Sequence, residues 1–260
     1  MTQPPTLPPD TPDDVLINPE YPAAPSEVPA VDPAMNAEMV RAPVGDEAVG
    51  RTVVHLLRHG EVYNPEKVFY GRLPGFRLSD LGLRMAERAA GFFSSRDIVL
   101  VISSPMERAQ QTAEPVAATH ELEIGTDPRL TEATSVFQGQ TFGVGDGSLK
   151  HPRQWKHLRN PFRPSWGEPY QQVADRMHEA ARAARDLARG HEAVLVSHQM
   201  PIWMARLSAE NKRLWHDPRK RECSLASVTS IEYEGDRIVS VTYAEPSHDL
   251  LPGAQKIAGA

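Results

Sequence analysis

An arginine and a histidine stand at the end of an apolar run near the end of the first quarter of the chain. The run from Val53 to Leu57 is interrupted only by His55, and Arg58 and His59 follow it directly. Such a continuous apolar run is typical of a strand that is covered on both faces. Open parallel sheets bind ligands at the carboxyl ends of their strands. We therefore predict that Arg58 and His59 are reactive groups, whereas the isolated His55 is interpreted as structural.

Two later segments have the same form. The apolar run 98–102 is followed by Ser103 and Ser104, and the run 193–197 is followed by His198. Because the carboxyl ends of parallel strands meet at one edge of a sheet, these polar groups are expected to converge with the first pair.

A helix is predicted to begin directly after the second strand. Ser104, Pro105 and Glu107 have the spacing of a capping box with proline at the first helical position, which predicts a helix over residues 105–119. Arg108 would then lie in the first turn, where a cation opposes the helix dipole and needs an anion, either a ligand or a structural carboxylate. Two arginines, two histidines and a helix start make a site for a dianionic phosphoryl group.

The remaining pattern alternates strands with helices. Residues 61–78 read as a loop, a helix follows from Ser79, and another helix of about 20 residues ends near Gly190. A short helix to about Ala209 and two closing strands, 227–233 and 237–243, complete the domain. This order predicts an α/β fold with an open, mostly parallel sheet.

The first 50 residues differ in composition from the rest. They contain 11 of the 24 prolines, and nine acidic residues against one arginine give them a net charge of −8, while the whole chain carries −6. Little of this segment could be buried to offset chain entropy. We predict a disordered or extended arm over residues 1–50, as a plain tail or a docking segment, and a folded domain over 51–250. Fraying is expected from Pro252 onward.

An insert over about residues 133–167 has no clear period and is rich in glycine and proline. Such a long irregular stretch is typical of a functional lid or of disorder. Its side chains either contact a substrate with a second anionic or flat group, or form a solvated face over a small satellite core. Its basic residues, set against the single acid Asp146, are Lys150, Arg153, Lys156, Arg159 and Arg163.

The composition argues against several classes of protein. One cysteine, Cys223, excludes a disulfide scaffold and favours a reducing, cytoplasmic compartment. No apolar run approaches the roughly 18–20 residues that span a bilayer, and no signal-peptide pattern opens the chain. A basic stripe for nucleic acid and a metal-ligand spacing are both absent from the sequence, so we expect no nucleic-acid or membrane partner, no metal and no cofactor.

These segments together resemble the histidine phosphatase superfamily, the phosphoglycerate mutase-like branch with an Arg-His-Gly motif. The resemblance covers about residues 52–243 and rests on four matching pieces in the order that the family has them, 58–61, 103–113, 130–132 and 196–198. An isolated Arg-His-Gly would be a weak signal, whereas the four pieces together are a strong one. The resemblance implies a three-layer α/β/α sandwich with a mostly parallel central sheet.

The resemblance also implies roles for five residues. His59 matches the nucleophile that becomes phosphohistidine, and Glu132 matches the proton donor to the leaving oxygen. The phosphate pocket would consist of Arg58, Arg108 and His198. Neighbouring cations would lower the pKa of His59 and so keep it neutral for attack, and a bound phosphate would raise the pKa of Glu132.

Two further residues are candidate contacts. Asn64 follows His59 by five residues, where many members of the family have an asparagine after six, and it is a candidate phosphate contact. The stretch 70–75 replaces the usual loop of the family, and its Arg72 is a candidate substrate contact.

A metal-independent phosphomonoesterase for a small phosphate ester is the function favoured by the resemblance. Ala-Thr-Ser-Val-Phe follows Glu132, where cofactor-dependent mutases continue with an arginine and a tyrosine that hold the glycerate carboxylate. Hydrolysis is therefore favoured over a bisphosphoglycerate-dependent mutase. A module that binds phosphate esters or phosphopeptides without catalysis is a third alternative. The identity of the ester and assembly into a homodimer are left open.

Overall fold

The computed structural model describes residues 50–141 and 166–254. Residues 1–49 of the predicted arm, residues 142–165 of the predicted lid and the last six residues lie outside the described part, so those predictions stay untested. Within the described part, no helix has the length and apolar character that crossing a membrane requires.

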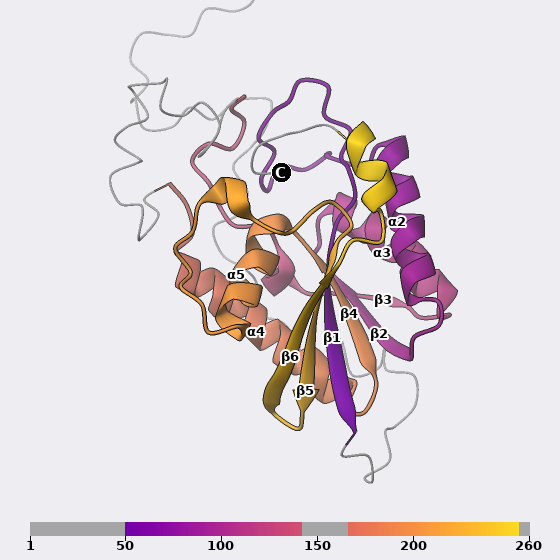
Figure 1. Ribbon diagram of the computed structural model, residues 1–260. Helices are drawn as coiled ribbons and strands as arrows, with labels where there is room; N and C mark the ends of the chain where they lie inside the picture. Colours follow the sequence, from indigo (N-terminus) through magenta and orange to yellow (C-terminus); the bar gives the residue numbers. More distant parts are fainter. Residues whose placement is uncertain (1–49, 142–165, 255–260) are drawn as a thin grey trace, which may run out of the picture.

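A six-stranded sheet forms the centre of the domain (Figure 1). Its strands lie in the order β3-β2-β4-β1-β5-β6. Neighbouring strands are parallel from β3 to β1, and β5 is antiparallel to both of its neighbours, so the sheet is mostly parallel as predicted. The strands have the bounds β1 Arg51–Arg58, β2 Ile98–Ser103, β3 Ile124–Thr126, β4 Glu192–Ser197, β5 Val228–Glu234 and β6 Arg237–Ala244.

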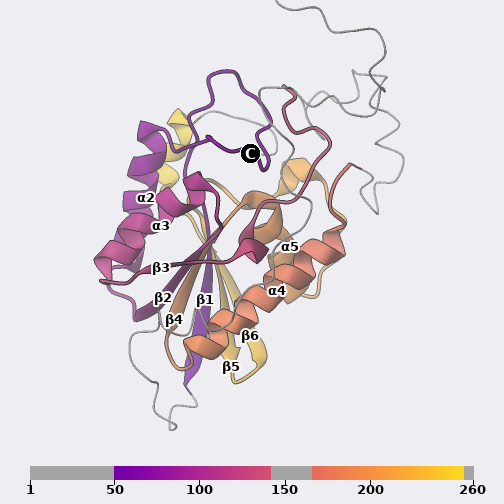
Figure 2. The same ribbon diagram turned by 180° about the vertical axis from the view of Figure 1, so that it is seen from behind.

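Helices cover both faces of this sheet, which gives the three layers that the family resemblance implies. Helices α2 and α3 pack on one face and α4 and α5 on the other (Figures 1 and 2). The α-helices have the bounds α2 Asp80–Phe93, α3 Glu107–Thr119, α4 Tyr170–Leu187 and α5 Gln199–Ala209. The short 3-10 helices among the described residues have the bounds η1 Pro128–Leu130, η4 Pro218–Lys220 and η5 His248–Gly253.

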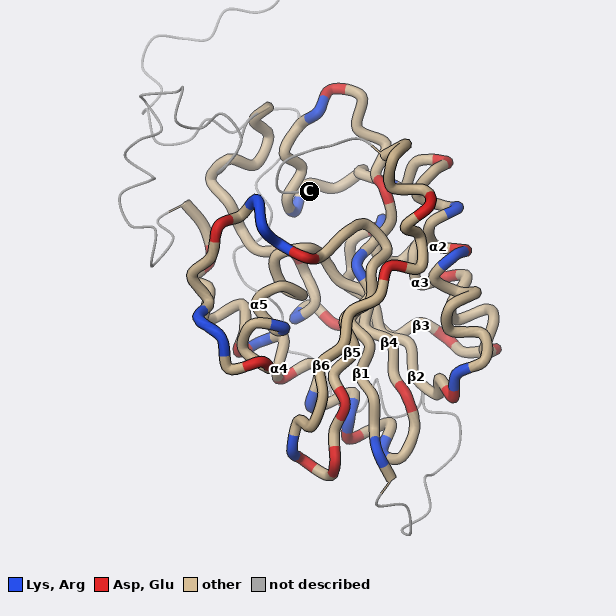
Figure 3. Tube along the Cα trace, in the orientation of Figure 1, with Lys and Arg blue, Asp and Glu red and all other residues tan. Residues whose placement is uncertain are grey.

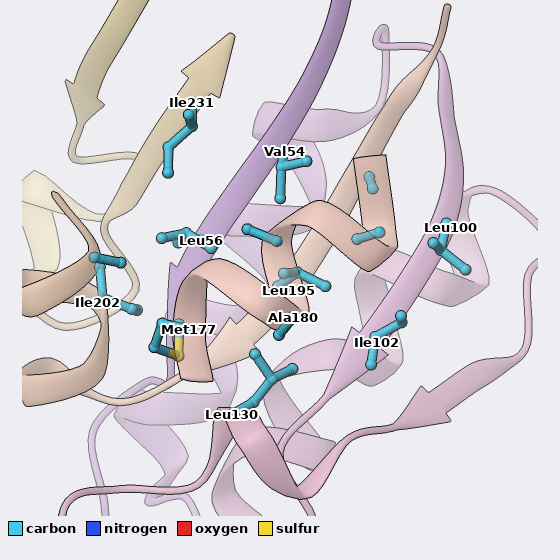
Figure 4. Close-up of a cluster of buried hydrophobic side chains, with 14 of the residues drawn as sticks. Val54, Leu56, Leu100, Ile102, Leu130, Met177, Ala180, Leu195, Ile202 and Ile231 are labelled. Atoms are coloured by element: carbon cyan, nitrogen blue, oxygen red, sulfur yellow. The ribbon is translucent and has the colours of Figure 1, made fainter. Parts of the chain in front are cut away.

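The core explains why β1 is apolar on both sides. Val54 and Leu56 pack in the cluster under α4 that Figure 4 shows, and Leu57 packs in the cluster under α2 and α3. His55 is fully buried, and its ring nitrogens bond Ser230 and Glu192, each at 2.7 Å. These bonds agree with the structural role predicted for His55.

The predicted capping box at the start of α3 is wrong. The helix begins at Glu107, and its N-cap Met106 makes no side-chain capping bond. The Ser104 hydroxyl bonds His198 Nε2 at 2.8 Å, and Glu107 Oε1 accepts from the Gly75 N–H at 2.9 Å. Glu107 is therefore engaged by a residue distant in sequence, and the Ser104 hydroxyl, besides its bond with the distant His198, accepts from the Met106 N–H at 3.4 Å. Arg108 still lies in the first turn, as predicted.

Two other element boundaries differ from the predictions. The sequence analysis did not find β3, which has only three residues and so leaves almost no alternation to detect. The helix expected to run to Gly190 ends at Leu187, and Gly190 has the left-handed φ of 81° that reverses the chain. The closing strands and the short helix α5 agree with the expected ranges.

Candidate active site

The carboxyl ends of three neighbouring strands are joined by backbone hydrogen bonds. The His59 N–H donates to the Ser197 carbonyl at 3.1 Å, and the Ser104 N–H donates to the Val196 carbonyl at 2.9 Å. Because β4 lies between β1 and β2, these bonds hold the residues that follow each strand against one another. The loop of residues 61–78 arches above this edge (Figure 1).

The two ring nitrogens of His59 have different surroundings. Nδ1 lies 2.7 Å from the Gly60 carbonyl, which can only accept a hydrogen bond. The neutral ring therefore carries its proton on Nδ1, and its lone pair is on Nε2. Nε2 is buried and has no hydrogen-bond partner in the described part of the chain.

His198 lies beside His59, with ring centroids 5.2 Å apart. Its Nε2 is bonded to the Ser104 hydroxyl, and its Nδ1 is buried without a partner among the described residues. Burial, followed by the charge of Arg108, lowers the pKa of His198 well below its usual range. The ring of His198 is therefore neutral near pH 7.

Arg108 is fully buried at the same point. One of its terminal nitrogens donates to the Gly71 carbonyl at 2.7 Å, and its guanidinium lies 4.7 Å from the ring centroid of Tyr70. The other two guanidinium nitrogens, Nε and Nη1, have no partner among the described residues. A buried cation with free donors is costly unless an anion meets it.

Arg58 brings a second cation, and its Nη1 donates to the Cys223 carbonyl at 2.5 Å. Desolvation lowers the pKa of His59 well below its usual range, and the charges of Arg108 and Arg58 lower it further. The predicted effect of flanking cations is thus present, but burial of the imidazole is the larger cause.

Glu132 is buried beside these cations and is 5% exposed. Its Oε1 accepts from the Ala133 N–H at 2.7 Å. Burial raises the pKa of its carboxyl group, although that bond and the charges of Arg108 and Arg58 oppose the shift. A carboxyl group with a raised pKa is suited to donate a proton.

Two close backbone approaches fix the loop that carries His59. A Cβ on Gly60 would lie 2.5 Å from the Gly82 carbonyl oxygen, and a Cβ on Gly82 would lie 2.0 Å from the Glu61 carbonyl oxygen. The Gly60 N–H donates to the Thr112 hydroxyl, which in turn donates to the Arg108 carbonyl. The start of α2 and the first turns of α3 therefore set the position of His59.

A family model for the histidine phosphatase superfamily (branch 1) matches residues 54–246, which include every residue of this cluster. The chain belongs to the histidine phosphatase superfamily.

Curated relatives agree with this family. The uncharacterized protein Rv0525 of Mycobacterium tuberculosis (strain ATCC 25618 / H37Rv) is 55% identical over 196 residues, which are 75% of this chain and 97% of the relative. A probable phosphoglycerate mutase GpmB of Yersinia pestis (strain Pestoides F) is 32% identical over 186 residues, which are 67% of this chain and 83% of the relative.

A solved structure shows the same fold. The mycobacterial glucosyl-3-phosphoglycerate phosphatase Rv2419c superposes with a TM-score of 0.60 over 75% of this chain and 98% of its own, at 23% identity. This likeness supports the three-layer architecture of the superfamily.

The structure brings together five of the seven residues predicted for this histidine phosphatase site. Asn64 and Arg72 are buried, and their observed bonds are to the protein. The Asn64 amide exchanges hydrogen bonds with the backbone of Val68, at 2.8 and 3.1 Å. Arg72 donates to the Glu132 carbonyl at 2.5 Å and to Glu168 at 3.2 Å. Their contacts with phosphate or substrate stay predictions.

Sequence reasoning missed two residues of this site, Tyr70 and Arg221, and it placed Ser104 at a strand end without finding its partner. Tyr70 supports the guanidinium of Arg108, and its ring centroid is 6.3 Å from that of His59. The Ser104 hydroxyl orients His198, a role hidden by its apparent position in a capping box. Arg221 comes from the segment between α5 and β5 and carries no local motif. Only the tertiary fold brings Tyr70 and Arg221 to this edge of the sheet.

A pocket opens beside Glu132 and encloses about 550 Å³ of empty space, part of it open to solvent. It extends away from Glu132 between the base of the insert and the segment that carries Arg221. The insert is closed at its base, where the Val136 N–H donates to the Trp166 carbonyl at 2.8 Å. The described residues contain no group of three or more His, Cys, Asp or Glu side chains placed to hold a metal ion.

Proposed function

We propose that this chain is a phosphomonoesterase that hydrolyses a small phosphate ester through phosphohistidine at Nε2 of His59. One observation carries the proposal: the bond from Nδ1 to the Gly60 carbonyl puts the lone pair of a neutral imidazole on the buried Nε2, which has no partner among the described residues, in a ring on which the charges of Arg108 and Arg58 act. A nucleophile needs such a lone pair, and covalent capture divides one difficult hydrolysis into two easier steps.

In the first step, the Nε2 lone pair attacks phosphorus and the ester P–O bond breaks. The proton of the Glu132 carboxyl group passes to the leaving oxygen, so that the alcohol departs neutral. Arg58 and Arg108 offset the charge on the phosphoryl oxygens as the group moves. If the Ser104 hydroxyl donates to Nε2 of His198, then Nδ1 of His198 carries the proton and donates to a further phosphoryl oxygen.

In the second step, water attacks phosphorus and the N–P bond breaks. The Glu132 carboxylate left by the first step accepts the proton of this water, and inorganic phosphate is released. Both steps use side chains of the protein and water. We place the enzyme in the cytoplasm, with a small-molecule ester as its partner and neither nucleic acid nor membrane, on the sequence arguments.

The test compares the wild type with His59→Ala in phosphate release from a panel of metabolite phosphate esters and from p-nitrophenyl phosphate. The wild type should turn over at least one ester, and His59→Ala should reduce kcat by roughly 1,000-fold or more. Rapid acid-free quenching after exposure to a labelled ester should leave label on the wild type only. The exposed His248→Ala is the control and should behave as the wild type. Full activity of His59→Ala would refute the phosphohistidine.

The similarity to the probable phosphoglycerate mutase GpmB favours one other candidate, a bisphosphoglycerate-dependent mutase. Such an enzyme would return the phosphoryl group from His59 to a second phosphoglycerate oxygen instead of to water. A coupled assay decides between the two: we expect release of inorganic phosphate from 3-phosphoglycerate to outpace its isomerisation. Faster isomerisation would assign the chain to the mutases.

A further inference from the structure

The pocket beside Glu132 lies where the alcohol part of the ester has to be. In the reaction proposed above, Glu132 protonates the leaving oxygen, so the carbon attached to this oxygen must lie next to Glu132. The lining of the pocket continues from Glu132 to Trp166, Tyr170, Gln199, Met200 and Arg221. The residues of this lining therefore contact the part of the substrate that differs between one phosphate ester and another.

Two other arginines in the described part of this region share one carboxylate. Glu168 forms ion pairs with Arg72 at 3.2 Å and with Arg176 at 2.8 Å, and Arg176 also donates to the Arg129 carbonyl. These bonds tie both guanidinium groups to Glu168 and to the backbone, whereas Arg221 has no carboxylate partner among the described residues.

Arg221 differs from these cations because both of its side-chain hydrogen bonds go to neutral groups. Its Nε donates to Nε2 of His216 at 2.8 Å, and its Nη1 donates to the Gln199 side-chain oxygen at 3.3 Å. Burial lowers the pKa of His216 to about 4, so this imidazole is neutral near pH 7. Arg221 forms no ion pair with a carboxylate in the described part of the chain. Figure 3 shows residues 219–221 as a blue run between two acidic positions, on the segment that leads into β5.

We propose that Arg221 binds a carboxylate on the alcohol part of the substrate, which makes the substrate class phosphate esters of hydroxy acids. This inference rests on the proposed function. The planar guanidinium matches the planar carboxylate. Apart from Arg58 and Arg108, which we assign to the phosphoryl group, Arg221 supplies a single charge at this pocket, and a single charge suits a group of charge −1 better than a second phosphate of charge near −2. His216 and Gln199 hold the guanidinium by two of its nitrogens and so fix its orientation before the substrate arrives.

Arg221 could instead act on the reaction through Glu132, and the experiment has to distinguish this role from the binding of a carboxylate. The charges of Arg221 and Glu132 act on one another, and Arg221 opposes the raised pKa of Glu132. If Arg221 did no more than adjust this acid, its loss would change the turnover of every ester by a similar factor. If it binds a carboxylate, its loss changes the ratio between esters with and without that group.

The experiment uses a matched pair of esters, 3-phosphoglycerate and glycerol 3-phosphate, in which a hydroxymethyl group replaces the carboxylate. We expect the wild type to prefer 3-phosphoglycerate in kcat/KM, and Arg221→Gln to reduce this preference by about 10- to 100-fold. Arg219→Gln removes the same charge two residues away, where the guanidinium is exposed and paired with Asp217, and should keep the wild-type ratio. Equal treatment of the two esters by the wild type would overturn the proposal, as would an equal loss for both in Arg221→Gln.

Binding measurements keep the proposal testable without turnover. Calorimetry with His59→Ala and with the double variant His59→Ala/Arg221→Gln should show the same loss of preference for 3-phosphoglycerate. Lack of turnover in the wild type together with this binding preference would reject the proposed hydrolysis and retain the carboxylate site. If circular dichroism shows that Arg221→Gln does not fold, Arg221→Lys takes its place. It keeps the positive charge but lacks the planar guanidinium, and it should retain only part of the preference for 3-phosphoglycerate. A full preference in Arg221→Lys that ionic strength abolishes would contradict a specific pair.

Discussion

Single side chains at this site divide into those that are already satisfied and those that are not. Arg72 and Asn64 have protein partners for their polar groups, whereas Arg108, His59 and His198 keep nitrogens that are buried without a partner among the described residues. Buried polar groups are normally paired, so unpaired nitrogens that converge on one point indicate a place where a ligand supplies the partners. Arg108, His59 and His198 all belong to the group of residues that we assign to the phosphoryl transfer.

The role of Glu132 can be tested by the leaving group. Glu132→Gln removes the proton donor while keeping the size of the side chain, so esters of ordinary alcohols should lose about 100- to 10,000-fold in kcat. An aryl phosphate with an acidic leaving phenol needs little protonation and should lose about tenfold or less. The measurement is kcat for p-nitrophenyl phosphate and for an alkyl ester. Equal losses for the two would contradict the assignment, and the exposed Glu114→Gln serves as the control.

At the scale of elements, the position of His59 depends on how closely the start of α2 approaches the loop after β1. Gly60 and Gly82 face one another across this contact, and Ser79, the N-cap of α2, accepts from the Gly82 N–H and donates to Glu61 at 2.5 Å. A local helix-capping bond is thus joined directly to the segment that carries His59.

Gly82→Ala should damage both stability and activity. Its Cβ would lie 2.0 Å from the Glu61 carbonyl oxygen, so α2 must move or the loop must shift. We expect a loss of about 2–4 kcal/mol in the free energy of unfolding, measured in urea, and at least a tenfold fall in kcat/KM. Gly91→Ala in the last turn of the same helix meets no atom within 4 Å and should be neutral or stabilise by about 0.5–1 kcal/mol. An equal free energy of unfolding for Gly82→Ala and Gly91→Ala would refute the claim that the close contact at Gly82 is needed.

The sequence predicts the elements that carry their own local signal. Apolar runs that end in Arg58-His59, Ser103-Ser104 and Ser197-His198 identify three parallel strands, and the geometry of a parallel sheet then predicts that their ends meet. Tyr70 and Arg221 could not be found in this way, because each lies in an irregular segment and reaches the site only through tertiary packing. The Ser104 capping box failed for a related reason, since its hydroxyl had a distant partner, His198, that no local pattern reveals.

The whole molecule buries several imidazoles that resist protonation, and this has a consequence for its stability in acid. Among the described residues, burial lowers the pKa of the imidazole of His55, His59, His178, His198 and His216. The unfolded chain therefore binds more protons than the folded protein once the pH falls below about 6.5. Acid has the opposite effect through Glu132. Its pKa is raised in the folded protein, so its contribution favours the folded state and is fully present below the unfolded pKa of about 4.5.

We accordingly expect the free energy of unfolding to fall as the pH drops from 7.5 to 5.5. Each of these imidazoles contributes at most about 1.4 kcal/mol per pH unit once the pH lies below its unfolded pKa. Urea titrations at both pH values measure the loss. The double variant His59→Gln/His198→Gln should show a smaller pH dependence than the wild type, and His248→Gln, which alters an exposed ring, should keep it. An unchanged slope in the double variant would contradict the pKa shifts.

The rigid cations around His59 also bear on how the enzyme would respond to its own product. Arg108 is held by Gly71 and Tyr70 before any ligand binds, so its free donors meet the oxygens of an ester and of orthophosphate in the same way. Because these residues bind the phosphoryl oxygens, which esters and orthophosphate have in common, the site has little means of rejecting the released ion. Orthophosphate, and oxyanions of similar shape such as vanadate, should therefore compete with every substrate, and cellular phosphate would restrain turnover whichever alcohol the pocket beyond Glu132 accepts.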